Sequence, residues 1–206
     1  MGKQKPRTEV FLNLPYDSKF ENLYLSYICA IYAFGMVPRV TLEIPGGARR
    51  LDRIFSLIQG CQFSIHDLSR VELDRSKPRT PRFNMPFELG LTVGWQKMRR
   101  GRHVWFVMEA KDYRLEKSLS DLKGTDPYIH GGTIEGVFRE IGNAFVRQGM
   151  QPTVPQMRSI CRHVKAGIPA ILRRCGAVSV FQARAFREIS IAASAAAGAT
   201  VLGISP

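Results

Sequence analysis

The sequence predicts an α/β protein in which a parallel β-sheet is covered by helices on both faces. Three observations lead to this prediction. Apolar strand-like runs alternate with amphipathic helix-like runs over residues 1–148, about five strand candidates can be counted, and 45% of the 206 residues are hydrophobic, which suffices for one substantial core. With about five strands, the expected architecture is a flavodoxin-like three-layer sandwich.

The first two elements are expected to be a strand over residues 9–14 and a helix over residues 19–34. The strand candidate is followed by Pro15-Tyr16-Asp17-Ser18, which are turn and N-cap residues. Apolar side chains repeat at helical spacing through the helix candidate, and Gly35 is placed to end it.

Three further elements, a strand, a helix and a strand, are expected over residues 37–44, 51–60 and 62–67. Pro45-Gly46-Gly47 breaks the chain before the helix. A long polar loop, of a length that is usually functional, then leads to a helix expected to start at Pro86, because proline suits the first helical position. This helix fades near Arg100.

The rest of the sheet region is expected to supply two strands, over residues 103–109 and 127–130. A short helix and loop are expected over residues 118–126, and a further helix over residues 134–145. Val104-Trp105-Phe106-Val107 is nearly continuously apolar, as is typical of a strand covered on both faces. Gly131-Gly132-Thr133 is typical of a tight turn and helix cap. No G-x-G-x-x-G or P-loop lysine pattern supports a phosphate-binding turn there.

Residues 149–206 are expected to form a helical C-terminal extension to the α/β domain of residues 1–148. Pro152 and Pro155 suggest a joint, and residues 154–186 show helical spacing. The Ala- and Gly-rich tail over residues 189–206 is short and weakly apolar for a membrane span, which needs about 20 apolar residues. We expect a packed helix or frayed end there and no membrane partner.

The chain is strongly basic, with 30 Lys and Arg against 17 Asp and Glu and a formal net charge of +13. This favours anionic partners such as nucleotides, nucleic acid or acidic protein surfaces, unless it is only a solvated basic face. Nucleic acid is the less expected partner, because aromatic residues are not interleaved with the basic runs.

Cysteine and histidine usage points to a cytoplasmic protein without a metal site. The four cysteines show no C-x-x-C spacing, which suggests reduced core residues. The basic N-terminus leads into no apolar segment of the kind that directs secretion. The histidines lie on separate predicted elements without metal-ligand spacing.

A ligand crevice is expected where the first and third strands lie side by side, at their carboxyl ends. The first strand ends at Leu14-Pro15-Tyr16-Asp17, and the third ends at His66-Asp67-Leu68-Ser69. The following helix brings Glu88 towards the same mouth. The predicted substrate-binding residues are Leu14, Pro15, Tyr16, Asp17, Asp67, Ser69, Arg82 and Asn84.

Glu88 is the candidate catalytic residue. A carboxylate at a dry helix start can stabilise an oxocarbenium-like centre or attack it, so that the C1′–N bond to a base or to nicotinamide breaks. The alternative interpretation is that Glu88 only complements the helix dipole or closes a capping box.

The neighbouring residues also carry two interpretations each. Asp17 and Asp67 can bond ribose hydroxyls, Tyr16 can stack on a ring, and Arg82 or Arg70 can meet phosphates. Alternatively, Asp17 is a turn or N-cap residue, Asp67 fixes the loop after its strand, and Tyr16 covers the core. A hydrolase triad of His66, Asp67 and Ser69 is not expected, because adjacent strand residues point to opposite faces.

The segment Ile65-His66-Asp67-Leu68-Ser69, followed by Asn84-Met85-Pro86-Phe87-Glu88-Leu89-Gly90, resembles the TIR-like and nucleoside 2-deoxyribosyltransferase-like families. The resemblance implies a flavodoxin-like fold and a catalytic role for Glu88 in N-glycosidic-bond cleavage. It implies ribose-side or pocket-shaping roles for Asp67 and Asn84. This chain departs from the better known pattern in its Met85-Pro86 step, its very basic loop and its C-terminal extension.

The resemblance further implies NAD as a substrate rather than a cofactor, and homo-oligomerisation or a partner protein for activation. It suggests a role in bacterial antiphage defence, by degrading NAD or forming a cyclic ADP-ribose-type signal. Two alternatives stay open: a nucleoside or nucleotide deoxyribosyltransferase or hydrolase, and a non-catalytic module that senses nucleotides or binds nucleic acid.

Overall fold

The protein is built on a five-stranded, all-parallel sheet with strand order β2-β1-β3-β4-β5. The computed structural model describes residues 7–43, 49–70, 77–99 and 103–201. The strands are β1 (Glu9–Asn13), β2 (Val37–Arg39), β3 (Phe63–Asp67), β4 (Val104–Glu109) and β5 (Tyr128–Ile129). This order is that of a flavodoxin-like sandwich, so the predicted fold class is confirmed.

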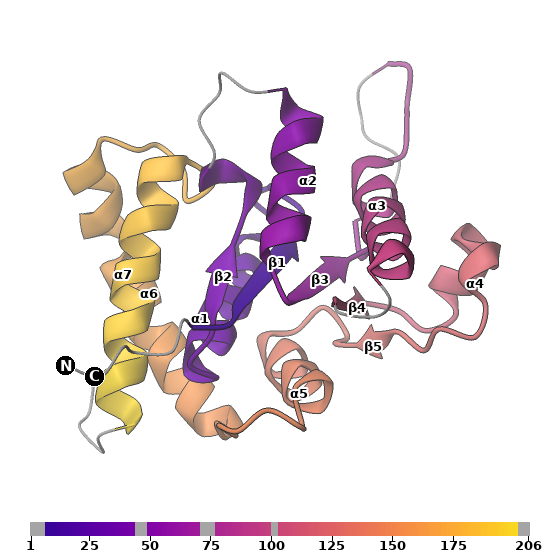
Figure 1. Ribbon diagram of the computed structural model, residues 1–206. Helices are drawn as coiled ribbons and strands as arrows, with labels where there is room; N and C mark the ends of the chain where they lie inside the picture. The colour runs from indigo at the N-terminus through magenta and orange to yellow at the C-terminus, as the bar shows by residue number, and fades with distance from the viewer. Residues whose placement is uncertain (1–6, 44–48, 71–76, 100–102, 202–206) are drawn as a thin grey trace.

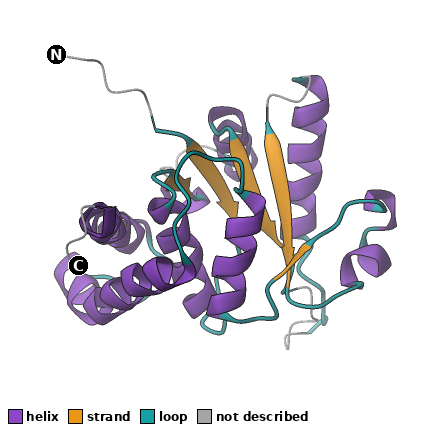
Figure 2. Cartoon of the chain, turned by 90° about the horizontal axis from the view of Figure 1, so that it is seen from below, coloured by secondary structure: helices purple, strands orange, loops and turns teal. Residues whose placement is uncertain are grey.

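Helices cover both faces of the sheet, as Figures 1 and 2 show. The α-helices are α1 (Glu21–Ala33), α2 (Arg50–Gly60), α3 (Asn84–Met98), α4 (Arg114–Ser118), α5 (Ile134–Ala144), α6 (Val154–Cys175) and α7 (Ala183–Val201). Helices α2 and α3 contact each other on one face. Helices α1 and α5 cover the other face, with α6 and α7 packed behind α1.

Helix α1 is buried on nearly all sides, because it lies between the sheet and the two C-terminal helices. A helix in that position must be apolar all round, and its sequence contains few residues that need solvent. One hydrophobic cluster joins the sheet, α1, α5, α6 and α7, from Val10 and Ile28 to Val164 and Ile189. The C-terminal helices therefore share the core of the sheet region.

The C-terminal helices follow local sequence signals. Thr153 and Gln156 form a reciprocal capping box at the start of α6, and Gly176 ends it in the left-handed conformation at φ 61°. The predicted Ala-rich tail continues as α7, which buries Ala193 and Ala196. Residues 202–206 of the tail lie outside the described residues. Within the described residues, no helix combines the length and apolar character needed to cross a membrane.

Several boundaries differ from the sequence prediction. The second strand ends at Arg39 rather than residue 44, and a short 3-10 helix, η1 (Thr41–Glu43), follows it. The Glu43 carboxylate accepts the N–H of Val40 at 2.7 Å, which turns the chain out of the sheet. The helix expected over residues 118–126 is instead α4 and a 3-10 turn, η2 (Ser120–Leu122). The predicted break at residues 45–47 lies outside the described residues.

Candidate functional site

Helix α3 contacts α2 on one face of the sheet (Figure 1). Its residue Glu88 lines the same cavity as Leu14, which follows β1, and Arg50, the first residue of α2. Helix α3 begins at Asn84, two residues before the predicted start at Pro86. Proline fits there because its missing N–H falls among the first four amides of a helix, which have no partner within it. The earlier start places Glu88 fifth in the helix.

Glu88 is not a capping residue. The N-terminus of α3 has no side-chain cap and no acidic residue in its first turn, beyond which the helix dipole has little effect. The Glu88 residue is only 3% exposed. Thr92 donates to its backbone carbonyl at 3.0 Å, but no described residue donates a hydrogen bond to its carboxylate. A buried carboxylate without such a donor is available to a ligand.

Glu88 lines a cavity of about 280 Å³ at the carboxyl ends of the strands, here called the Glu88 cavity. Its lining residues are Leu12, Asn13, Leu14, Pro15, Tyr16, Thr41, Arg50, Arg82, Asn84, Met85 and Glu88. Six of the nine sequence-predicted site residues thus come together here. The other three, Asp17, Asp67 and Ser69, do not line the cavity.

Burial raises the pKa of the Glu88 carboxyl from 4.5 to about 7, and the positive charge of Arg50 lowers it by a smaller amount. Desolvation disfavours the charged carboxylate, so the group is poised between its two protonation states near neutral pH. A shift of this kind in a cleft is typical of a catalytic acid, base or nucleophile.

Five of the lining residues were not predicted from the sequence: Leu12, Asn13, Thr41, Arg50 and Met85. The Asn13 amide nitrogen donates to the Met85 carbonyl at 3.0 Å and lies 2.9 Å from His66 Nδ1, which ties β1 to the first turn of α3. The Asn13 side-chain oxygen is buried without a hydrogen-bond partner. The sequence signal that could have indicated Asn13 as a site residue is its position near the carboxyl end of the first predicted strand.

Tyr16 lines the cavity and also packs against the core. Its hydroxyl lies 3.1 Å from Thr41 Oγ1, and its ring makes an edge contact with Tyr24. Burial raises the pKa of Tyr16 to about 12, so its hydroxyl stays protonated at neutral pH. Both interpretations of Tyr16, wall of a ligand site and cover of the core, are therefore compatible with its position.

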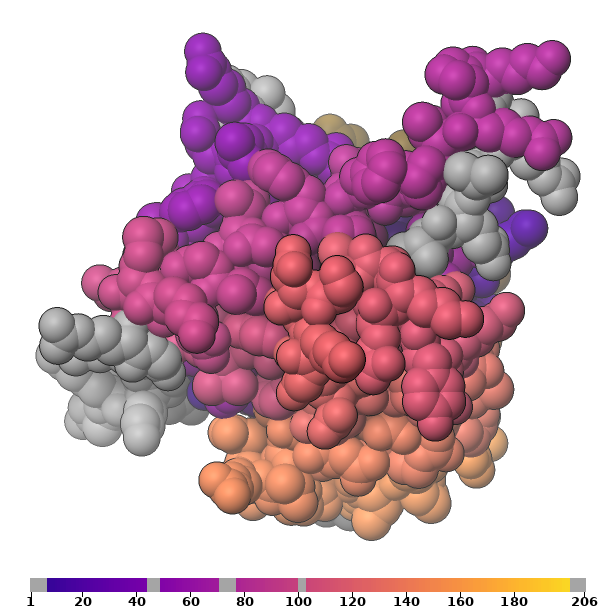
Figure 3. Space-filling model, turned by 90° about the vertical axis from the view of Figure 1, so that its right-hand side faces the viewer, coloured from indigo at the N-terminus to yellow at the C-terminus, as the bar shows by residue number. Residues whose placement is uncertain are grey.

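Asp17 is a turn residue that holds two arginines. Its Oδ1 accepts the N–H groups of Lys19 and Phe20 at 3.1 and 3.2 Å. Its Oδ2 accepts from Arg70 Nε at 3.2 Å and from Arg82 Nη1 at 3.1 Å. Residues 77–82, which precede α3, project from the top of the molecule in Figure 3. Asp17 thereby anchors Arg82 against the body of the protein at the mouth of the cavity.

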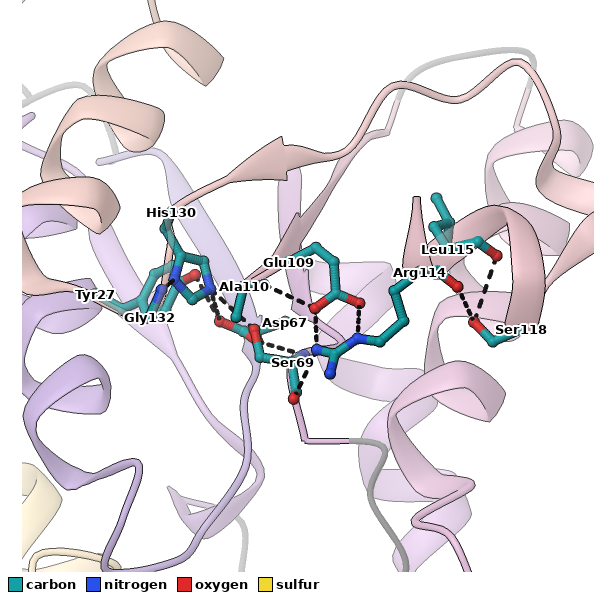
Figure 4. Close-up of polar contacts among 10 residues, drawn as sticks. All are labelled: Tyr27, Asp67, Ser69, Glu109, Ala110, Arg114, Leu115, Ser118, His130 and Gly132. Atoms are coloured by element: carbon teal, nitrogen blue, oxygen red, sulfur yellow. Dashed lines mark hydrogen bonds and ion pairs between the residues drawn. The ribbon is translucent and has the colours of Figure 1, made fainter. Parts of the chain in front are cut away.

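Asp67 lies away from the Glu88 cavity, on the side of the sheet covered by α1, in a buried polar cluster (Figure 4). Its Oδ2 accepts from the Tyr27 hydroxyl at 2.8 Å and lies 3.1 Å from His130 Nε2, while its Oδ1 accepts the Ser69 N–H at 2.8 Å. Arg114 extends the cluster by donating to the Ser69 carbonyl at 2.7 Å and pairing with the buried Glu109. Asp67 therefore fixes the loop after its strand.

This cluster does not have the geometry of a hydrolase triad. The Gly132 N–H donates to His130 Nδ1 at 3.0 Å, so a neutral His130 carries its proton on Nε2. That one nitrogen faces both Asp67 and the Ser69 hydroxyl, the latter at 3.0 Å. In a triad the serine and the acid bind different ring nitrogens. The predicted separation of His66 from Asp67 is also seen, because His66 contacts Asn13 and not this cluster.

We expect Asp67→Asn to lower the free energy of unfolding by about 2 kcal/mol, because an amide cannot accept at both positions and leaves a buried donor without its partner. Urea denaturation measures the loss. Ser69→Ala is the matched control: it keeps the Asp67 carboxylate and should be less damaging. An Asp67→Asn protein with wild-type stability would contradict the structural role of this carboxylate.

Among the described residues, no three or more His, Cys, Asp or Glu side chains are grouped so as to hold a metal ion. The four cysteines, Cys29, Cys61, Cys161 and Cys175, are free thiols, and the first three are buried.

Comparison with known proteins shows no family for this chain. No protein-family model matches the chain. Serine/threonine-protein kinase SAPK3 from Oryza sativa subsp. indica and the protein of the same name from subsp. japonica are each 26% identical to it over 159 residues. The alignments cover 77% of this chain and 46% of each kinase, so the chain spans about half the length of these relatives.

Proposed function

We propose that this protein cleaves an N-glycosidic bond at the Glu88 cavity, with NAD as the foremost substrate. The observation that carries the proposal is the Glu88 carboxylate itself: 3% exposed, without a hydrogen-bond donor among the described residues, and with a pKa raised to about 7. Its cavity is lined by the carboxyl end of β1, which pairs with β3, and ligands bind near this pair of strands in this strand order.

The proposed reaction breaks the bond between C1′ of a ribose and the pyridinium nitrogen of NAD. Nicotinamide leaves as a neutral molecule and takes the bonding electron pair, so no general acid is needed. The ionised Glu88 carboxylate stabilises the positive charge that develops at C1′, or attacks it. Water then adds to C1′ and loses a proton, which gives ADP-ribose; addition of a hydroxyl or ring nitrogen of the same molecule gives a cyclic product.

The other cavity residues support binding of a nucleotide. Arg50 and Arg82 place two positive charges in the lining, where guanidinium groups suit phosphate oxygens. A role in antiphage defence, and activation by assembly or a partner, stay predictions from the resemblance.

The size of the cavity favours a second candidate, a nucleoside deoxyribosyltransferase or hydrolase. A volume of about 280 Å³ lies at the lower end of ligand pockets, which span about 300–1,000 Å³, and suits a nucleoside better than a whole dinucleotide. NAD binding at this site requires its second nucleotide to extend beyond the cavity.

Phosphoryl transfer is not part of the proposal. The rice relatives are named as kinases, but this sequence contains neither the His-Arg-Asp nor the Asp-Phe-Gly tripeptide of protein kinases.

The test is chromatographic detection of nicotinamide released from NAD and of bases released from nucleosides. The assay is run at several protein concentrations, because assembly is an expected requirement, with Glu88→Gln protein as the blank. Nicotinamide release by wild type alone supports the main proposal, and base release from nucleosides without NAD cleavage supports the second. Equal release by the blank would contradict both.

The pH dependence of cleavage follows from the required charge of Glu88. Only the ionised form stabilises the transition state, so kcat/KM for NAD is expected to rise as pH increases towards 7 and to level off above it. Initial rates at low NAD concentration between pH 5 and 9 measure this. A fall above pH 7 would instead mark Glu88 as a proton donor. In the complex with NAD, the cationic pyridinium favours the ionised carboxylate and lowers the pKa of Glu88. The pH at which kcat levels off should therefore be lower than the pH at which kcat/KM levels off.

A further inference from the structure

A second and larger hollow lies between the edge strand β2 and helix α7, here called the α7 groove. Its volume is about 870 Å³, and its lining includes Arg7, Tyr32, Pro38, Arg184, Phe186 and Arg187. It shares no lining residue with the Glu88 cavity. Substitutions in one hollow therefore leave the walls of the other intact.

The groove carries an excess of positive charge. Both of its acids, Glu9 and Glu43, are paired with Arg39, at 2.6 and 3.0 Å. Arg184 and Arg187 are exposed on the first turns of α7 and make no ion pair with any described residue. Arg7, from the chain just before β1, donates to the neutral Ser194 hydroxyl at 3.4 Å. The lining therefore holds four arginines against two carboxylates, a net excess of two positive charges.

The groove also has an apolar and aromatic wall. Its lining includes the half-buried Tyr32, Pro38 of β2 and the largely buried Phe186. Burial raises the pKa of Tyr32, so this side chain is neutral. A ligand that fits this surface combines an anionic part with a flat apolar part.

An added peptide strand does not fit the groove. Strand β2 has three residues, and the middle one, Pro38, has no N–H to donate to a neighbouring strand. The volume instead lies within the range of small-molecule sites, about 300–1,000 Å³.

We propose that the α7 groove binds a small molecule that carries a polyphosphate on an aromatic body, the chemistry of a nucleoside triphosphate. Arg7, Arg184 and Arg187 contact the phosphates, because guanidinium forks match phosphate oxygens and three cations suit more than one phosphate group. The ring of Tyr32 contacts the aromatic body.

Isothermal titration of the full chain with ATP tests the proposal, at one fixed salt concentration. Arg184→Ala/Arg187→Ala is expected to weaken ATP binding by at least about tenfold, since two charge-assisted contacts are lost. The matched control is Arg162→Ala/Arg173→Ala, which removes two exposed arginines from α6, outside the groove. It should change the affinity by less than about twofold. Inorganic tripolyphosphate, which lacks the aromatic body, should bind more weakly than ATP.

Three outcomes would overturn the proposal. The first is that the wild-type protein does not bind ATP, and the second is that both double variants weaken binding equally. The third is that Arg50→Ala abolishes binding while Arg184→Ala/Arg187→Ala does not. The last result would place ATP in the Glu88 cavity. Circular dichroism of each variant confirms that a loss of binding is not a loss of fold.

Discussion

Glu88→Gln is expected to reduce kcat/KM for N-glycosidic cleavage by about 10²–10³-fold, with the fold intact. Removing one group that stabilises transition-state charge in a dry site lowers the rate by about 10²–10³-fold, and Glu88 is the acid that lines this cavity. Glutamine has the same length and shape but no charge. Nicotinamide or base release by purified variant and wild type measures the difference.

Two further variants separate charge from shape and position. Glu88→Asp keeps the charge but withdraws the carboxylate by one methylene, and a displacement of about 1 Å lowers rates by about 10²-fold. Glu116→Gln removes an exposed acid on α4, away from the cavity, and should leave the rate unchanged. A Glu88→Gln protein that retains most of its activity would contradict the assigned role, as would an equal loss in Glu116→Gln.

The order of strands and helices could be predicted because local patterns dominate it. Alternation of apolar runs with amphipathic segments leads to a parallel sheet, and right-handed crossovers leave few strand orders. The end of β2 could not be predicted from the same patterns. Val40 has high strand propensity. However, its N–H donates to the Glu43 carboxylate, and this local hydrogen bond turns the chain out of the sheet.

The site was predictable as a location but not residue by residue. Alternation in a strand tells us that His66 and Asp67 point to opposite faces, but not which face holds the cavity. In the structure, His66 meets Asn13, which bonds Met85 of α3, whereas Asp67 meets Tyr27 of α1. Glu88 lies on α3, so the cavity is on the His66 side.

The contact between Asp67 and His130 could not be predicted for a different reason. His130 lies 63 residues away in the sequence and reaches Asp67 only because α5 packs closely against the turn after β5. Gly136 permits this approach, since a Cβ at that position would fall 1.8 Å from the His130 carbonyl oxygen. A glycine within an apolar helical stripe gives no sign, by itself, of which backbone it touches.

The buried Glu88 carboxylate is expected to destabilise the folded protein at alkaline pH, so Glu88→Gln should become the more stable protein as pH rises. The pKa of Glu88 is about 7 in the folded state against 4.5 when unfolded, so the folded state binds the proton more tightly. The free energy of unfolding therefore falls between pH 4.5 and 7. At 1.36 kcal/mol per pKa unit, the full difference is about 3 kcal/mol above pH 7.

Urea denaturation of wild type and Glu88→Gln at pH 5 and pH 8 measures this effect. His66, whose pKa burial lowers to about 3, weakens the fold as pH falls below 6.5, but it does so in both proteins and cancels in their difference. Any cost of burying the glutamine amide is the same at both pH values. The variant's advantage should thus grow from pH 5 to pH 8, and a constant difference would contradict the raised pKa. The ionised Glu88 carboxylate thus lowers the stability of the folded protein. Under the proposed function, this loss of stability is the cost of holding a catalytic carboxylate in a dry site.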